Sequence, residues 1–162
     1  MSRKPIFMAK YGSPKHVDDI LNSKDAPWDT VNKAVRHNQF LTMDHVKKVV
    51  NDFGGAEHTD LARNQNLPHG AIDHLLDHVN DGYVDVALAT HQKHLTPEHI
   101  HKLLDRRDQI VDIELAKHKN LQPDHVDKLF DKSHEGSKHD MAKIELAKNH
   151  KIPQESISNS YN

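Results

Sequence analysis

The chain has 162 residues, with 22 Lys and Arg against 24 Asp and Glu and a formal net charge of −2 at pH 7. So balanced a charge argues against bulk electrostatic binding to nucleic acid or to a membrane surface. The sequence contains no cysteine, which excludes disulfides and cysteine-ligated iron–sulfur clusters, and its unusual feature is 16 histidines. No stretch approaches the roughly 20 apolar residues of a membrane span, and the N-terminal segment lacks the apolar run of a secretory signal. We therefore expect a soluble, cytoplasmic protein with no membrane partner.

The chain begins with half of a helical unit and then starts a full one. Residues 1–11 share the apolar pattern of the later second helices, so we predict an N-terminal capping half-repeat. The first full repeat, 12–40, has Ser13 as N-cap and Pro14 at the first helical position. Its second helix opens near Trp28, the only tryptophan, which we expect to pack between the first and second repeats.

The second and third repeats, 41–66 and 67–94, depart from an ideal helical unit in different ways. The first helix of the second repeat carries three valines on its apolar side, Val46, Val49 and Val50. Because β-branched residues favour helix weakly, tertiary packing must hold this helix. The third repeat places Gly70 near its first helix start, which weakens the predicted cap.

The fourth repeat, 95–120, is the clearest unit. Thr96 is a good N-cap and Pro97 fits the first helical position. An apolar stripe follows at helical spacing, at Ile100, Leu103 and Leu104. We predict a second helix from about 109 to 118 with a buried side made of Ile110, Ile113, Leu115 and Ala116. Such a hairpin cannot bury its own apolar face and needs neighbours on both sides.

The fifth repeat, 121–151, contains an inserted polar loop at 132–138, and 152–162 forms a C-terminal cap that frays. Repeat starts recur about every 26–31 residues. We therefore predict a single all-α domain, residues 1–162, built of about five short helical-hairpin repeats.

The repeated pattern, "LTPEHI…LL…D…V…LA.N.N", resembles short HEAT-like or variant leucine-rich repeats, as in uncharacterised tailed-phage proteins and some bacterial ones. The resemblance covers roughly residues 6–157 and is clearest in 95–120 and 121–151. It implies a right-handed α-solenoid and, usually, protein binding. Some variant leucine-rich repeat proteins carry a cysteine-ligated iron–sulfur cluster, which a chain without cysteine cannot hold.

The histidines have a structural and a metal-binding interpretation. Four of them recur just before the first stripe residue of four repeats, which favours a structural role at the helix start: His16, His45, His99 and His125. His74 and His78, at i and i+4, could ligate a metal, and a second cluster surrounds one loop: His91, His94, His99 and His101. Because neither an H-E-x-x-H motif nor a cysteine completes a site, we expect no metal and no cofactor.

Catalytic motifs are lacking. The sequence has no G-x-S-x-G elbow, phosphate-binding loop or dinucleotide fingerprint. Capping and dipole complementation explain the acidic residues near helix starts and on exposed faces, such as Glu98, Glu114, Asp124 and Glu145. A HEAT-like fold also occurs in alkylated-base DNA glycosylases, but those need a basic, aromatic-lined groove. We therefore expect no catalytic residue and no nucleic-acid partner.

The polar sides of the second helices are the predicted partner-binding surface, because stacked hairpins usually bind partners along one set of helices. The candidate residues are Lys33, Arg36, Asp60, Arg63, Asp85, Asp112, Glu114, Lys117, Lys143, Glu145 and Lys148. The leading hypothesis is a non-enzymatic protein-binding α-solenoid, such as a phage factor that binds or inhibits a host protein in the host cytoplasm. One alternative is a structural component packed into a virion or another large particle. A second alternative is a metal-binding or enzymatic HEAT-like protein.

Overall fold

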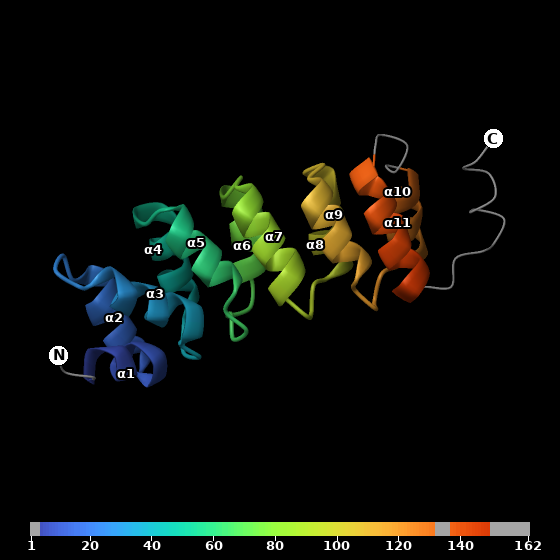
Figure 1. Cartoon of the computed structure of the whole chain (residues 1–162). Coiled ribbons are helices and arrows are strands. Elements are labelled where there is room, and N and C mark those ends of the chain that lie inside the picture. Colours follow the sequence, from blue (N-terminus) through green and yellow to red (C-terminus); the bar gives the residue numbers. More distant parts are fainter. Residues whose placement is uncertain (1–3, 132–136, 150–162) are drawn as a thin grey trace, which may run out of the picture. The chain divides into compact units, whose positions relative to one another are not determined.

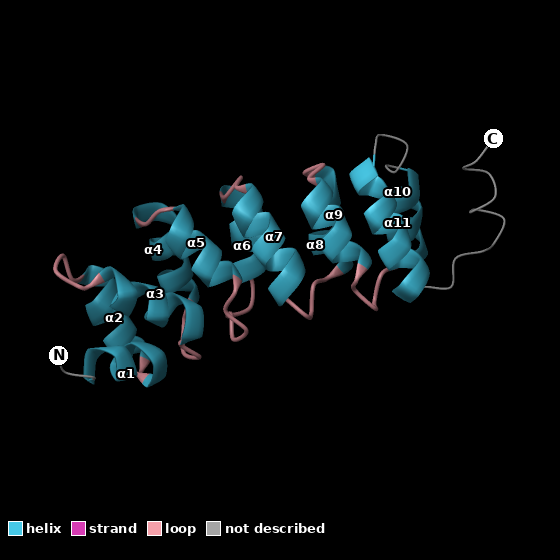
Figure 2. Cartoon of the chain, in the orientation of Figure 1, coloured by secondary structure: helices cyan, strands magenta, loops and turns pink. Residues whose placement is uncertain are grey.

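The computed structural model describes residues 4–131 and 137–149. Regular structure in these ranges is entirely α-helical, with eleven helices and no strand (Figure 2). The predicted all-α class is therefore confirmed for the described residues. Most of the predicted polar loop at 132–138 and all of the predicted C-terminal cap at 152–162 lie outside them.

The helices follow the predicted alternation of first and second helices. The capping half-repeat is one helix, and each repeat then contributes an even-numbered first helix and an odd-numbered second helix. In chain order they are α1 (Lys4–Tyr11), α2 (Pro14–Asn22), α3 (Trp28–His37), α4 (Met43–Asp52), α5 (Gly55–Ala62), α6 (Ala71–His78), α7 (Gly82–His91), α8 (Pro97–Asp105), α9 (Gln109–Ala116), α10 (Pro123–Asp131) and α11 (Ser137–Asn149).

Two compact units make up the chain, residues 1–94 and residues 95–162, and they divide at the predicted boundary between the third and fourth repeats. In the first unit the second helices contact one another in order, α1 to α3 to α5 to α7 (Figure 1). Its first helices contact one another in the same way, α2 to α4 to α6. In the second unit α9 contacts α11 and α8 contacts α10. Each unit thus has one row of first helices and one row of second helices.

The predicted apolar stripes form the core. One stripe residue from each first helix is at most 1% exposed: Val17, Val46, Leu75, Leu103 and Leu129. Second helices contribute buried pairs such as Leu61 with Ala62 and Leu115 with Ala116. In each first helix the stripe residues recur at i, i+3 and i+4, so these helices present a continuous apolar side to their neighbours.

Helix starts also follow the sequence signals. The Thr96 side chain accepts a hydrogen bond from the backbone N–H of His99 at 3.2 Å, as an N-cap should. The third repeat differs, because Gly70 adopts a left-handed conformation with φ of 84° and the helix begins only at Ala71. A residue with a side chain rarely adopts that conformation, which explains why glycine stands there.

Two burial predictions are wrong. Trp28 is 74% exposed and does not pack between repeats, because it is the first residue of α3 and the buried side of that helix begins at Thr30. Ile110 is 53% exposed, whereas Val111 is fully buried. Val111 and Leu115, at i and i+4, share the buried side of α9, and a helix turns by about 100° per residue, so the side chain before Val111 points away.

Candidate functional site

Buried amide side chains join the second helices of the first unit. The Asn38 Nδ2 donates to the backbone carbonyls of Ala9 at 2.9 Å and Gly12 at 3.0 Å. One repeat later, the Asn64 Nδ2 donates to the carbonyls of Val35 at 2.8 Å and Asn38 at 2.9 Å. Each amide therefore bonds carbonyls at the C-terminal end of the preceding second helix, which its own helix cannot satisfy.

The third repeat continues this amide ladder, which consists of Asn38, Asn64 and Gln92. The Gln92 Nε2 donates to the carbonyls of Ala62 at 2.8 Å and Asn64 at 2.7 Å. Sequence reasoning missed the ladder. The signal was present, since each amide stands three places before the start of the next repeat at Leu41, Leu67 and Leu95.

A cavity lies beside the amide ladder, where α3, α5 and α7 end. Its volume is about 400 Å³, and its walls come from the last turns of these helices and the loops that follow. The lining side chains are all polar: Arg36, His37, Arg63, Gln65, Asn66, Thr90, His91 and Lys93. Two predicted partner-binding residues, Arg36 and Arg63, are therefore brought together in one pocket.

Positive charge exceeds negative charge around this pocket. The Asp60 Oδ1 lies 3.7 Å from an Nη1 of Arg36 and 3.7 Å from an Nη1 of Arg63, so two guanidinium groups share one carboxylate. The Asp60 side chain is only 12% exposed, whereas those of Arg36 and Arg63 are 43% and 37% exposed. Lys93, exposed on the pocket wall, adds a third cation. The open side of the pocket is therefore cationic.

The cations around the pocket also affect the protonation of His37. Desolvation and the nearby cations Lys33, Arg36 and Lys10 lower the pKa of His37, and Asp60 opposes them. His37 is therefore neutral at pH 7, and the charge on the pocket comes from the arginines and the lysine.

The predicted partner-binding residues divide by exposure. Lys33, Arg36, Lys117 and Lys148 are exposed, and a second group is half-buried: Arg63, Glu114, Lys143 and Glu145. Three acidic residues are buried and do not lie on an exposed surface, which corrects the predicted set: Asp60, Asp85 and Asp112. Asp85 and Asp112 each follow a fully buried valine, so they fall inside the wide arc that a helix buries when it packs against several neighbours.

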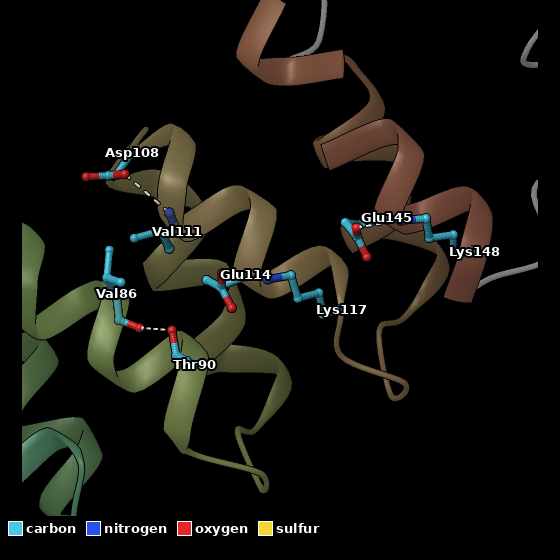
Figure 3. Close-up of polar contacts among 8 residues, drawn as sticks. All are labelled: Val86, Thr90, Asp108, Val111, Glu114, Lys117, Glu145 and Lys148. Atoms are coloured by element: carbon cyan, nitrogen blue, oxygen red, sulfur yellow. Dashed lines mark hydrogen bonds and ion pairs between the residues drawn. The ribbon is translucent and has the colours of Figure 1, made fainter. Parts of the chain in front are cut away.

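Acid–cation pairs recur near the ends of the second helices (Figure 3). The Glu114 Oε1 lies 2.7 Å from the Lys117 Nζ, and the Glu145 Oε1 lies 3.0 Å from the Lys148 Nζ. Both pairs span i to i+3, at the ends of α9 and α11, which contact each other. Asp60 with Arg63 is the counterpart at the end of α5. Repetition of the hairpin therefore repeats a polar arrangement as well as a core.

The recurring histidines close the helix starts, which confirms their predicted structural role. In each of the four repeats the imidazole Nδ1 accepts a hydrogen bond from the backbone N–H of the N-cap residue, at 3.0–3.1 Å: His16, His45, His99 and His125. Glutamate or glutamine normally fills this position of a capping box. Since Nδ1 accepts, the neutral ring carries its proton on Nε2. In His45 that Nε2 donates to the Asp18 Oδ1 of the preceding repeat at 2.7 Å.

His125 has a different neighbour. Its side chain is fully buried, and its Nε2 has no hydrogen-bond partner. His101 of the fourth repeat occupies the position that Asp18 has in the first repeat. Its ring centroid lies 4.4 Å from that of His125 in an edge-to-face arrangement. The His101 Nε2 lies 3.1 Å from the Asp124 Oδ2. Burial lowers the pKa of His125 and His101 adds to the lowering, whereas Asp124 and the backbone carbonyl of Pro97 oppose it.

His101, Asp124 and His125 form the one group of three possible metal ligands in the described part of the chain, with ligand atoms within 4.8 Å of one another. Neither predicted histidine grouping, that of His74 with His78 or that around His91, forms such a group. A metal on the His125 Nε2 would shift the proton to Nδ1, where it would face the Gln122 N–H at 3.1 Å. Metal binding there therefore competes with the helix cap.

None of the described helices combines the length and the apolar character that crossing a bilayer requires. Comparisons of the chain with models of protein families, with curated proteins and with solved structures found no match.

Proposed function

We propose that this protein is a non-enzymatic, protein-binding helical-repeat protein, whose hairpins stack as a right-handed α-solenoid and whose second helices carry the binding surface. The supporting observation is the recurrence of an acid–cation pair near the ends of α5, α9 and α11, with distances of 3.7, 2.7 and 3.0 Å. The resemblance to repeats of tailed-phage proteins supports a phage factor with a host protein as its partner.

Folding does not require the pairs at the ends of α9 and α11. Exposed ion pairs contribute only about 0–1 kcal/mol to stability, and the side chains of Lys117 and Lys148 are 46% and 62% exposed. A repeat protein that carries similar charged groups at several repeats, as this one does in the second, fourth and fifth, offers a partner repeated contacts. The repeated charges therefore fit recognition better than stability.

The test is affinity capture with a triple variant, Arg63→Glu, Lys117→Glu and Lys148→Glu. We expect the variant to keep the helical circular dichroism spectrum and nearly the same melting temperature but to lose the protein that the wild type captures. The matched control, Lys15→Glu, Lys24→Glu and Lys47→Glu, makes the same change in charge at exposed residues on or near first helices and should still capture it. If the triple variant binds that protein with unchanged affinity, the second helices do not carry the surface.

A further inference from the structure

We infer that the pocket at the ends of α3, α5 and α7 binds acidic side chains of a partner protein, with Arg36, Arg63 and Lys93 as the contacting cations. This inference rests on the proposed function, because it assumes that the partner is a protein. It adds the chemistry of the partner, an Asp- or Glu-rich segment, and the place where that segment binds.

Both arginines lie near Asp60, but this carboxylate does not pair all of their N–H donors. Their Nη1 atoms approach the same Asp60 oxygen at 3.7 Å, which is an ion-pair distance but too long for a hydrogen bond. The Arg63 Nε is buried and lacks a hydrogen-bond partner. A guanidinium group offers five N–H donors in a planar fork that matches a carboxylate. A second carboxylate entering from the open side would therefore pair with the exposed parts of the two guanidinium groups, whose side chains are 43% and 37% exposed.

Helix-dipole complementation does not account for this arrangement by itself. Basic residues are favourable at helix C-termini, where carbonyl groups lack partners. Here Asn64 already donates to carbonyls at the end of α3, and Gln92 does so at the end of α5. Gln65 bonds the carbonyls of Arg63 and His91 through its Nε2, at 3.2 and 2.8 Å. The amides therefore satisfy these helix ends, and the cations of the pocket remain available.

The lining favours a peptide over a nucleic acid. No Phe, Tyr or Trp lines the pocket, whereas single-stranded nucleic acids are usually bound by stacking on aromatic rings. Three cations and one carboxylate give a local excess of positive charge in a chain whose net charge is −2. A cavity of about 400 Å³ has room for a short stretch of acidic side chains.

The experiment measures binding of fluorescein-labelled decaglutamate to the full chain by fluorescence anisotropy, at about 0.1 M salt because higher salt screens exposed charges. Replacing both arginines, Arg36→Gln and Arg63→Gln, should weaken binding about tenfold, since close interfacial charge pairs commonly contribute this much or more. The matched control Lys15→Gln with Lys24→Gln should change the affinity less than about twofold. Lys93→Glu, at an exposed residue, tests the pocket without disturbing Asp60.

Asp60→Asn provides a test in the opposite direction. It removes the carboxylate that competes for both arginines, so decaglutamate should bind about threefold more tightly, an outcome that mere loss of folding cannot produce. Unchanged affinity in the arginine double variant and in Lys93→Glu would overturn the inference, as would weaker binding by folded Asp60→Asn. Tighter, arginine-dependent binding of decathymidylate would overturn the assignment to an acidic peptide. If decaglutamate binding depends on the two arginines as expected but the wild type captures no protein, or the triple variant captures its partner with unchanged affinity, the result counts against the proposed function alone.

Discussion

At the scale of single residues, two histidines at equivalent positions of different repeats form the same helix cap in different surroundings. His45 and His125 both accept a backbone N–H through Nδ1 and present a protonated Nε2 to the preceding repeat. His45 meets the carboxylate of Asp18 at 2.7 Å, whereas the Nε2 of His125 is left without a partner beside His101. A buried donor without an acceptor costs about 1–3 kcal/mol, so this position is a weak point of the second unit.

His101→Asp should therefore stabilise the protein. The substitution places a carboxylate where the first repeat has Asp18, so the His125 Nε2–H gains an acceptor. We expect a gain on the order of 1 kcal/mol in the free energy of unfolding, because hydrogen bonds to charged groups contribute about 1.5–3 kcal/mol and the nearby Asp124 offsets part of this. The measurement is urea unfolding against the exposed control His69→Asp. A variant less stable than the wild type would contradict the assigned tautomer.

The surroundings of His125 should also make the stability of the protein depend on pH. The pKa of His125 is lowered in the folded wild type, while the unfolded ring keeps a value near 6.5. Below about pH 6.5 the unfolded state binds more protons, so wild-type stability falls as the pH falls. The new carboxylate should raise the folded pKa of His125 in the variant. The difference in unfolding free energy between His101→Asp and the wild type should therefore grow as the pH falls from about 6.5 to about 5. A difference that stays constant over this range would argue against the predicted hydrogen bond.

At the scale of elements, the amide ladder holds second helices together by polar contacts inside the core. Asn64 is fully buried, donates to two carbonyls of the preceding repeat and accepts the backbone N–H of Asn66 at 2.8 Å. An amide of this kind specifies which helix ends meet, because only one stacking register satisfies both of its hydrogen bonds to the preceding repeat.

Asn64→Ala should cost roughly 2–4 kcal/mol of unfolding free energy, since it leaves two buried carbonyls and one N–H without their partner. Asn66→Ala, which changes an exposed side chain two residues away, is the matched control and should cost little. Chemical denaturation of both variants provides the comparison. Equal stability of Asn64→Ala and the control would show that water replaces the amide without penalty.

At the scale of the whole molecule, helices contact their neighbours in the same row and their partners in the same hairpin. These contacts group into two compact units, residues 1–94 and 95–162. In repeat proteins, stability is approximately a sum of the repeats and their nearest-neighbour interfaces. A core truncation in one unit should therefore destabilise that unit more than the other.

Leu103→Ala, in the second unit, and Leu75→Ala, in the first, test this expectation. Both leucines are fully buried, and each truncation should cost roughly 2–5 kcal/mol. Hydrogen exchange should show the larger loss of protection in α8 to α10 for Leu103→Ala and in α2 to α7 for Leu75→Ala. Ile110→Ala, at a 53% exposed side chain, is the control. Equal loss in both units would mean that the chain unfolds as one cooperative block.

Local chemistry made much of the fold predictable from the sequence. The cap at Thr96 and the stripe at Ile100, Leu103 and Leu104 depend only on helical spacing and backbone donors, both of which lie within a few residues of one another. The structural role of the recurring histidines follows from their recurrence at one position of four repeats, although the sequence did not show that they close the caps.

Tertiary structure alone decided which polar groups meet. Arg36 and Asp60 are far apart in the sequence, and so are Asn64 and Val35, yet stacking of the second helices brings them together. Burial of Asp112 in place of Ile110 likewise depends on how the neighbouring helices cover α9. Periodicity states which side of a helix is apolar, but the contacts of a polar side chain are set by elements from other repeats. The candidate pocket, made where three such helices end, therefore follows from packing and not from any local pattern.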